Sequence, residues 1–226
     1  MLRNWLIKTQ LRYQISRCSD KAMQSYYQAC FPLLTQTIKE VPMLALDLEM
    51  TGLNPKQDQI ISIGLVPFVN GKIKLKQAQH KLIKIEGSVG QSATIHGVVD
   101  ADLQQALSLC DAMQWLITEA TGKVLVAHHA PLDLSFIEQA LLTHCNKKYR
   151  LFAIDTLQIE HQRLLRKQPL IKKGELRLTS CRERYKLPNY EAHNALVDAL
   201  SCAELLLAQV SKMGGLHNIN VCNLIR

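Results

Sequence analysis

The chain has 226 residues, of which 47% are hydrophobic and 20% charged, and its formal net charge is +8. This composition is typical of a soluble globular protein, and the absence of any apolar run near the roughly 20 residues that span a bilayer excludes a membrane-spanning protein class. The positive charge favours a polyanionic partner such as a nucleic acid.

The cysteines and the first residues indicate the compartment. The number of cysteines is odd and no Cys-x-x-Cys pair occurs, which indicates reduced thiols rather than a disulfide framework or a zinc site. The chain starts without an uninterrupted apolar stretch of signal-peptide length, so we expect a cytoplasmic protein with no membrane association. The cysteines are Cys18, Cys30, Cys110, Cys145, Cys181, Cys202 and Cys222.

Residues 1–41 are predicted to form a helical N-terminal extension. They are basic, since residues 1–40 hold six Lys/Arg against two Asp/Glu. A helical appendage packed on the main domain is one interpretation, and a docking arm for a protein partner or a nucleic acid is the other. The apolar residues near helical spacing are Leu2, Leu6, Leu11 and Ile15.

A main domain is expected over residues 42–212, and it starts with strands. The first strand covers 43–49 and the second 59–69, which ends at Asn70-Gly71, a dipeptide that favours a tight hairpin because both positions accept positive φ. A third strand between Ile73 and Ile85 completes a meander. A loop over 87–101 and a helix over 102–120 follow.

The second half alternates strands and helices. A strand at 123–127 leads into a helix whose first turn holds Pro131 and Asp133, and a strand at 151–154 leads into another helix. A basic loop at 166–174, helices at 175–186 and 194–211, and an unassigned C-terminal tail at 213–226 complete the chain. A meander followed by βαβ-like units predicts an α/β fold with a mixed five-stranded sheet flanked by helices.

Two carboxylates lie at the end of the first predicted strand. Because side chains alternate between the faces of a strand, Asp47 and Glu49 are expected to point the same way. Like charges in one small space raise each other's pKa or require a cation. Taken alone, the pair is more often a solvated strand end than a metal site, so its meaning depends on what converges on it.

Three further residues are expected at the same edge of the sheet. Asp133 lies in the first turn of a helix, while His193 and Asp198 lie at the start of the last long helix. Taken alone, His193 is explained as a helix cap and Asp198 as an exposed residue of an amphipathic helix. Together with Asp47 and Glu49 they suit two hard divalent cations about 4 Å apart, which would clamp a phosphodiester, with His193 taking a proton from water.

The order of these motifs resembles that of a known family. Asp-x-Glu in a first strand, His-x-Ala-Pro-x-Asp after a later strand and His-x-x-x-x-Asp in a late helix are similar to the DEDDh 3′→5′ exonucleases of the ribonuclease H-like fold. The resemblance is strongest to the proofreading epsilon subunit of bacterial DNA polymerase III and its stand-alone relatives. It covers roughly residues 42–210 and includes Ile95-His96-Gly97 and the stretch from Leu178 to Tyr185.

The resemblance implies a division of roles among the site residues. Residues matching Asp47, Glu49 and Asp198 hold one Mg²⁺ or Mn²⁺ ion, and Asp47 also holds a second. Asp133 supports the second ion largely through water, and His193 is the general base. The implied fold is ribonuclease H-like, with the N-terminal helical extension added.

The resemblance also implies where the terminal nucleotide binds, and there the chain departs from the family. Met50 stands where the family commonly has threonine, and His129 and Leu132 stand where it commonly has asparagine and phenylalanine. His129 is not expected to bind zinc, because no second ligand lies at a suitable spacing. The implied substrate-binding residues are Met50, Thr51, Gly52, Leu53, His96, His129 and Leu132.

We therefore expect a metal-dependent exonuclease that releases nucleoside monophosphates from the 3′ end of single-stranded DNA, in a role such as DNA repair. The first alternative keeps the site but makes RNA the substrate, as in ribonuclease T and oligoribonuclease, because no residue of the sequence reports on the 2′-OH. The second is a non-catalytic protein that binds nucleic acid or a polymerase.

Overall fold

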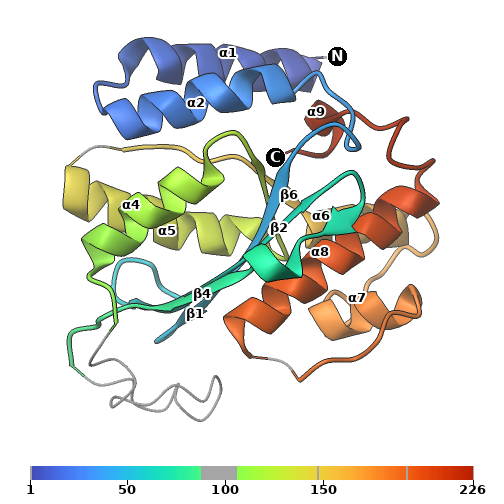
Figure 1. Cartoon of the computed structure of the whole chain (residues 1–226). Coiled ribbons are helices and arrows are strands. Elements are labelled where there is room, and N and C mark those ends of the chain that lie inside the picture. The colour runs from blue at the N-terminus through green and yellow to red at the C-terminus, as the bar shows by residue number, and fades with distance from the viewer. Residues whose placement is uncertain (1, 88–105, 147, 192, 226) are drawn as a thin grey trace.

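A computed structural model describes residues 2–87, 106–146, 148–191 and 193–225 (Figure 1). The predicted nucleotide-binding residue His96, with the loop around it, lies outside the described residues. So does the beginning of the helix expected from residue 102.

A mixed sheet forms the centre of the molecule (Figure 1). Its order is β3-β2-β1-β5-β6, with β4 also paired to β2. β1 runs antiparallel to β2 and parallel to β5, and β5 runs parallel to β6. The strands are β1 (Met43–Met50), β2 (Ile60–Val69), β3 (Lys72–Ile73), β4 (Gln79–Leu82), β5 (Val124–Ala127) and β6 (Ala153–Asp155).

The sheet has six strands instead of the expected five, because the strand predicted between Ile73 and Ile85 is two strands separated by a 3₁₀ turn, η1 (Leu75–Gln77). The hairpin itself forms as predicted, with positive φ at Asn70 and Gly71. Pro67 explains the interruption. Its carbonyl accepts the Lys74 N–H at 2.9 Å, but proline has no N–H to return, so the β2–β3 ladder stops there.

Helices cover both faces of the sheet, which confirms the predicted fold class. α8 packs across β1 and β2, whereas α4 and α5 lie on the other side in Figure 1. The described helices are α1 (Leu2–Arg17), α2 (Lys21–Leu33), α4 (Leu109–Ala120), α5 (Ala130–Cys145), α6 (Thr156–Leu165), α7 (Leu178–Arg184), α8 (Ala195–Lys212) and α9 (Val221–Leu224). None of these described helices is both long and apolar enough to cross a bilayer.

The helix predicted over 102–120 begins later, at Leu109. Ser108 is its N-cap, and the Ser108 hydroxyl accepts the Asp111 N–H at 3.1 Å. Leu107, just before the cap, forms a β-bridge with Ile83. Apolar periodicity placed the start of the helix too early. It does not distinguish an extended residue in a β-bridge, such as Leu107, from a residue in the first turn of a helix.

The N-terminal residues are helical as predicted, and they share the core of the main domain. α1 packs on α2, and α2 packs on α4 (Figure 1). Leu11, Tyr26 and Tyr27 are buried within the same apolar cluster as the strands, and the Tyr27 hydroxyl accepts the Arg150 N–H at 3.0 Å. The division of the chain at residue 41 stays a prediction, since the apolar cluster continues across it.

The C-terminal tail, which the sequence leaves unassigned, packs against the segment that follows α2. The N–H of Ile38 donates to the Ile219 carbonyl at 2.9 Å, and the N–H of Cys222 donates to the Leu34 carbonyl at 3.1 Å. Ile225 forms an antiparallel bridge with Ile154 of β6. The two ends of the chain therefore stabilise each other at the edge of the sheet opposite β3.

Candidate active site

Three carboxylates meet where β1 ends and α8 begins. Asp47 and Glu49 project from the same face of β1, and Asp198 lies in the first turn of α8. One carboxylate oxygen from each of the three lies within 4.8 Å of the others. All three side chains are half-buried. The structure thus brings together residues about 150 positions apart in the sequence.

The start of α8 is held by its cap. The Asn194 side chain accepts the N–H groups of Leu196 and Val197 at 3.1 and 3.2 Å, and its backbone carbonyl accepts the Asp198 N–H at 2.8 Å. Asparagine is among the preferred residues at this position because its oxygen satisfies N–H groups that have no helical partner. The cap fixes the direction in which Asp198 leaves the first turn.

Gly64 allows α8 to approach the strands this closely. It pairs with Asp47 in the β1–β2 ladder. A Cβ at Gly64 would lie 2.2 Å from the Ala195 carbonyl carbon and oxygen, at the first residue of α8. No larger residue fits without displacing the helix. The sequence reasoning missed this positioning role, although a glycine inside an apolar strand is a signal of close backbone approach.

Asp133 joins the group from α5. It lies in the first turn of that helix, after Pro131, and its side chain is only 5% exposed. Burial, followed by the charge of Asp155, raises the pKa of Asp133 well above its usual range. The charge of Asp133 in turn contributes, after burial, to the raised pKa of Asp47. The two carboxylates are therefore electrostatic neighbours, although Asp133 is outside the close triplet.

The pKa values of the other two carboxylates, Glu49 and Asp198, are also raised. Burial and then the charge of Asp198 raise the pKa of Glu49 to about 7. Burial also raises the pKa of Asp198, opposed by the His193 N–H, which donates to Asp198 Oδ2 at 2.8 Å. Four carboxylates without a cation would repel one another at neutral pH, and a donor set made only of carboxylate oxygens suits a hard divalent ion.

His193 is next to this cluster through its backbone. Its φ of +69° is unusual for a residue with a side chain, and the residue is exposed. This placement leaves the ring facing solvent at the entrance of α8. It is compatible with the predicted role as a base that acts on a water molecule.

The loop after β1 carries Thr51, Gly52 and Leu53, and Asp58 holds it in shape. Asp58 Oδ2 accepts the Asn54 N–H at 2.7 Å and would be 2.5 Å from a Cβ at Gly52. Leu53 is 74% exposed. The loop therefore presents an exposed apolar side chain four residues after Glu49, and it is held by an aspartate that the sequence reasoning did not single out.

Two of the expected nucleotide-binding residues, His129 and Leu132, lie at the start of α5. His129 is exposed, its φ is +79°, and its N–H donates to Asp155 Oδ1 at 3.0 Å. Met50 and Leu132 pack against the apolar core. Of the expected nucleotide-binding residues that the structure describes, Leu53 and His129 are thus the exposed ones, while Met50, Thr51, Gly52 and Leu132 are partly buried.

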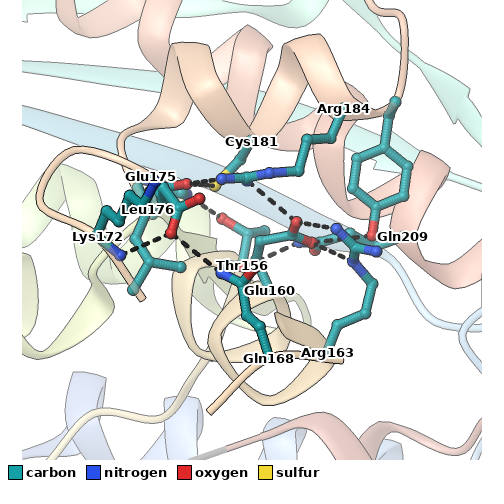
Figure 2. A network of polar contacts seen from close by, with 12 residues as sticks. Thr156, Glu160, Arg163, Gln168, Lys172, Glu175, Leu176, Cys181, Arg184 and Gln209 are labelled. Atoms are coloured by element: carbon teal, nitrogen blue, oxygen red, sulfur yellow. Dashed lines mark hydrogen bonds and ion pairs between the residues drawn. The ribbon is translucent and has the colours of Figure 1, made fainter. Parts of the chain in front are cut away.

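His128 connects this edge to the helices behind it. Its Nδ1 lies 2.8 Å from the Thr156 hydroxyl and its Nε2 lies 2.8 Å from the Leu176 carbonyl. Burial lowers the pKa of His128, which favours the neutral ring. The Thr156 carbonyl accepts the Gln209 amide at 2.9 Å, and Figure 2 shows Thr156, Leu176 and Gln209 within one network.

The same network fastens α6 to α7 through Glu160, which is fully buried (Figure 2). Its carboxylate accepts hydrogen bonds from Arg163 Nε at 3.0 Å, from Arg184 Nη1 at 3.2 Å and from the Tyr185 hydroxyl at 3.0 Å. Arg184 also donates to the Glu175 carbonyl. The sequence does not reveal this cluster, because Arg184 and Tyr185 reach Glu160 from a separate element.

The chain is similar to known exonucleases over most of its length. The RNase_T family model, described as exonuclease, matches residues 44–206. A DNA polymerase III PolC-type protein of Thermotoga petrophila is 28% identical over 178 residues, which are 78% of this chain but only 12% of that protein. The DNA polymerase III subunit epsilon of Treponema pallidum is 28% identical over 186 residues, 80% of this chain and 83% of that protein.

Solved structures share the fold. The nuclease domain of 3'hExo, a DEDDh family member bound to rAMP, superposes with a TM-score of 0.61 at 14% identity, covering 80% of this chain and 96% of that one. Escherichia coli exonuclease I in complex with a dT13 oligonucleotide gives a TM-score of 0.61 at 12% identity, covering 76% and 41%. The exonuclease family that the motifs predicted is confirmed: the chain belongs to the RNase_T exonuclease family.

Proposed function

We propose that this protein is a 3′→5′ exonuclease that releases nucleoside monophosphates from the 3′ end of single-stranded DNA by two-metal-ion hydrolysis. The observation that carries the proposal is the meeting of Asp47, Glu49 and Asp198 within 4.8 Å, with buried Asp133 beside them. Carboxylates held this close suit divalent ions that also bind phosphate oxygens.

Two Mg²⁺ or Mn²⁺ ions fit the carboxylates. Asp47, Glu49 and Asp198 would hold one ion, and Asp47 would share the second, with Asp133 supporting it through water. When bound, such ions neutralise charge on the phosphodiester and lower the pKa of a water molecule.

The protein's own groups supply the other parts of the reaction. The exposed imidazole of His193 accepts the proton of the attacking water. Leu53, exposed in the loop after β1, packs against the terminal base, while the backbone at Thr51 and Gly52 holds its sugar. His96, His129, Met50 and Leu132 complete the proposed nucleotide site.

Release of nucleotides from a 3′-labelled single-stranded oligonucleotide tests the proposal. With Mg²⁺ or Mn²⁺ the purified protein should release mononucleotides, and a chelator should stop the release. Asp47→Ala should abolish it, whereas Glu183→Gln, which removes an exposed carboxylate of α7, should leave it unchanged. An intact protein that releases nothing with either metal would overturn the proposal.

RNA is the second candidate substrate, in a 3′→5′ exoribonuclease of the ribonuclease T or oligoribonuclease type. The solved neighbours with related folds include one bound to a deoxyribo-oligonucleotide and one bound to rAMP. Met50, His129 and Leu132, which depart from the family pattern, surround the proposed nucleotide site. Matched DNA and RNA oligonucleotides compared by kcat/KM decide between the two, and a more than tenfold preference for RNA would favour this candidate.

A non-catalytic nucleic-acid or polymerase binding protein is the third candidate. It predicts salt-sensitive binding that Asp47→Ala leaves unchanged, and no release of nucleotides. The activity assay therefore separates it from both enzymes. The cytoplasmic location and a role in DNA repair go with the enzymatic proposal.

We also propose that α1 docks a protein partner with an acidic surface. Trp5, Leu6 and Tyr13 are 62%, 52% and 58% exposed on its outer face, and the helix contains four Lys/Arg and no Asp/Glu. The relative in Treponema pallidum is by name a polymerase subunit. Titration with purified polymerase subunits should show binding that weakens with salt and with Trp5→Ala, and salt-independent or unchanged binding would contradict this surface.

A further inference from the structure

A buried arginine lies between α7 and the loop that leads to His193. Arg182 is 2% exposed. Its Nη1 donates to the Ser201 carbonyl at 2.7 Å, and its Nη2 donates to the Pro188 carbonyl at 2.7 Å. Burying a guanidinium is costly unless its N–H groups are satisfied, and here both terminal nitrogens have partners, whereas Nε has none among the described residues.

A second set of contacts closes around the same loop. Arg182 Nη2 pairs with Glu204 Oε2 at 2.7 Å, and the guanidinium carbon lies 4.7 Å from the centre of the Tyr190 ring. The Tyr190 hydroxyl donates to Glu204 Oε1 at 3.1 Å. Glu204 thus accepts from both Arg182 and Tyr190, and the three side chains form one polar cluster.

This cluster, Arg182, Tyr190 and Glu204, is what holds the middle of the loop among the residues that the structure describes. Pro188, Asn189 and Tyr190 are otherwise exposed. At its start the loop is tied to α7 by the Leu187 N–H, which donates to the Arg182 carbonyl at 3.2 Å. At its end the His193 N–H donates to Asp198 Oδ2.

The cluster limits where His193 can lie. His193 is three residue steps along the chain from Tyr190, a span of at most roughly 10 Å. The planar guanidinium of Arg182 contacts two backbone carbonyls, the Glu204 carboxylate and the face of the Tyr190 ring. These contacts restrict the direction of the loop as well as its position. The ammonium of a lysine would keep the charge but not the fork.

We propose that Arg182 is a positioning residue for the exonuclease reaction, which acts with Glu204 and Tyr190 by fixing the loop that carries His193. The inference rests on the proposed function, in which His193 is the base. A base acts on water only within hydrogen-bond reach, and displacement by about 1 Å costs on the order of 100-fold in rate.

A double-mutant cycle tests the proposal. Arg182→Lys should lower kcat about 10- to 100-fold with a less than threefold change in KM for the oligonucleotide. In a His193→Ala background the same change should cost almost nothing further, because the residue through which Arg182 acts is gone. Arg150→Lys, the same change at an exposed arginine, should leave kcat unchanged. Independent, multiplying losses in the double variant would overturn the proposal.

Hydrogen exchange of the metal-free protein gives a readout without activity. Arg182→Lys should speed exchange in residues 187–193 and leave β1 protected, and Glu204→Gln, which keeps the side chain's size, serves if the lysine variant does not fold. Unchanged exchange together with unchanged kcat would refute the positioning role. A wild-type protein that releases no nucleotides would instead overturn the proposed function. The exchange measurement would still test whether Arg182 holds the loop, because it does not depend on activity.

Discussion

The carboxylates of the site change one another's pKa values. Burial and the charge of Asp198 raise the pKa of Glu49 to about 7, and burial and neighbouring carboxylates raise the pKa values of Asp47 and Asp133 well above their usual range. In the metal-free protein the site therefore favours protons or cations over free carboxylates. Protons and divalent ions compete for the same oxygens.

This competition predicts a pH-dependent stability. The folded pKa of Glu49, about 7, is above its ordinary value of 4.5. The stability this group contributes is therefore present below pH 4.5 and is lost as pH rises through about 7. In thermal denaturation, Mg²⁺ should raise the Tm more at pH 8 than at pH 6. An equal increase at both pH values would show that the carboxylates are not the binding groups.

At the scale of elements, close approach between a helix and two strands creates the site. α8 contacts β1 and β2 at Gly64, where there is no room for a side chain. Whereas Gly64 permits a close approach, Pro67 ends the β2–β3 ladder and so divides the strand expected between Ile73 and Ile85 into two. Both effects depend on which backbone lies beside the residue, and neither is visible in the apolar periodicity of β2.

Gly64→Ala is expected to reduce activity at least tenfold. Its Cβ would lie 2.2 Å from the backbone of Ala195, so α8 must shift and carry Asp198 away from Asp47. Overpacking of this kind also costs about 1–3 kcal/mol of stability. Urea denaturation and nucleotide release check both effects. Full activity with an unchanged Tm would mean that the helix start adapts without moving Asp198.

Glu160→Gln is expected to lower the stability of the fold and to leave kcat nearly unchanged. Removing the charge of a fully buried carboxylate leaves Arg163 and Arg184 without their partner, and breaking such a pair costs about 3–5 kcal/mol. The variant should unfold at lower urea concentration. At temperatures where it is folded, kcat should stay within about threefold of wild type, because Glu160 contacts none of the site carboxylates in the described network. A loss of kcat without destabilisation would contradict this assignment.

At the scale of the whole molecule, the two ends of the chain are part of the core. α1 and α2 bury Leu11, Tyr26 and Tyr27 against the main domain, and the segment around α9 is tied to the residues after α2. A family match over residues 44–206 therefore describes the reaction-bearing part of the chain and not the whole of its stabilising core.

Removal of residues 1–41 should destabilise the remaining protein severely. Each fully buried side chain of this kind is worth about 1.5–3 kcal/mol, so several of them approach the 5–15 kcal/mol of a typical domain. We expect the truncated protein to aggregate or to lose its cooperative unfolding transition, as measured by circular dichroism. A folded truncated protein with the Tm of the full chain would instead support a separable appendage.

The sequence by itself determined the fold class, the hairpin at Asn70-Gly71, the helix that follows the strand at 151–154 and the order of the acidic motifs. These depend on spacing and local backbone preference, which are written in adjacent residues. Tertiary structure alone decided the approach of α8 at Gly64, the clusters around Glu160 and Arg182, and the joining of both chain ends. Those contacts join residues far apart in the chain, whose meeting depends on how the elements pack and not on the period of any one of them.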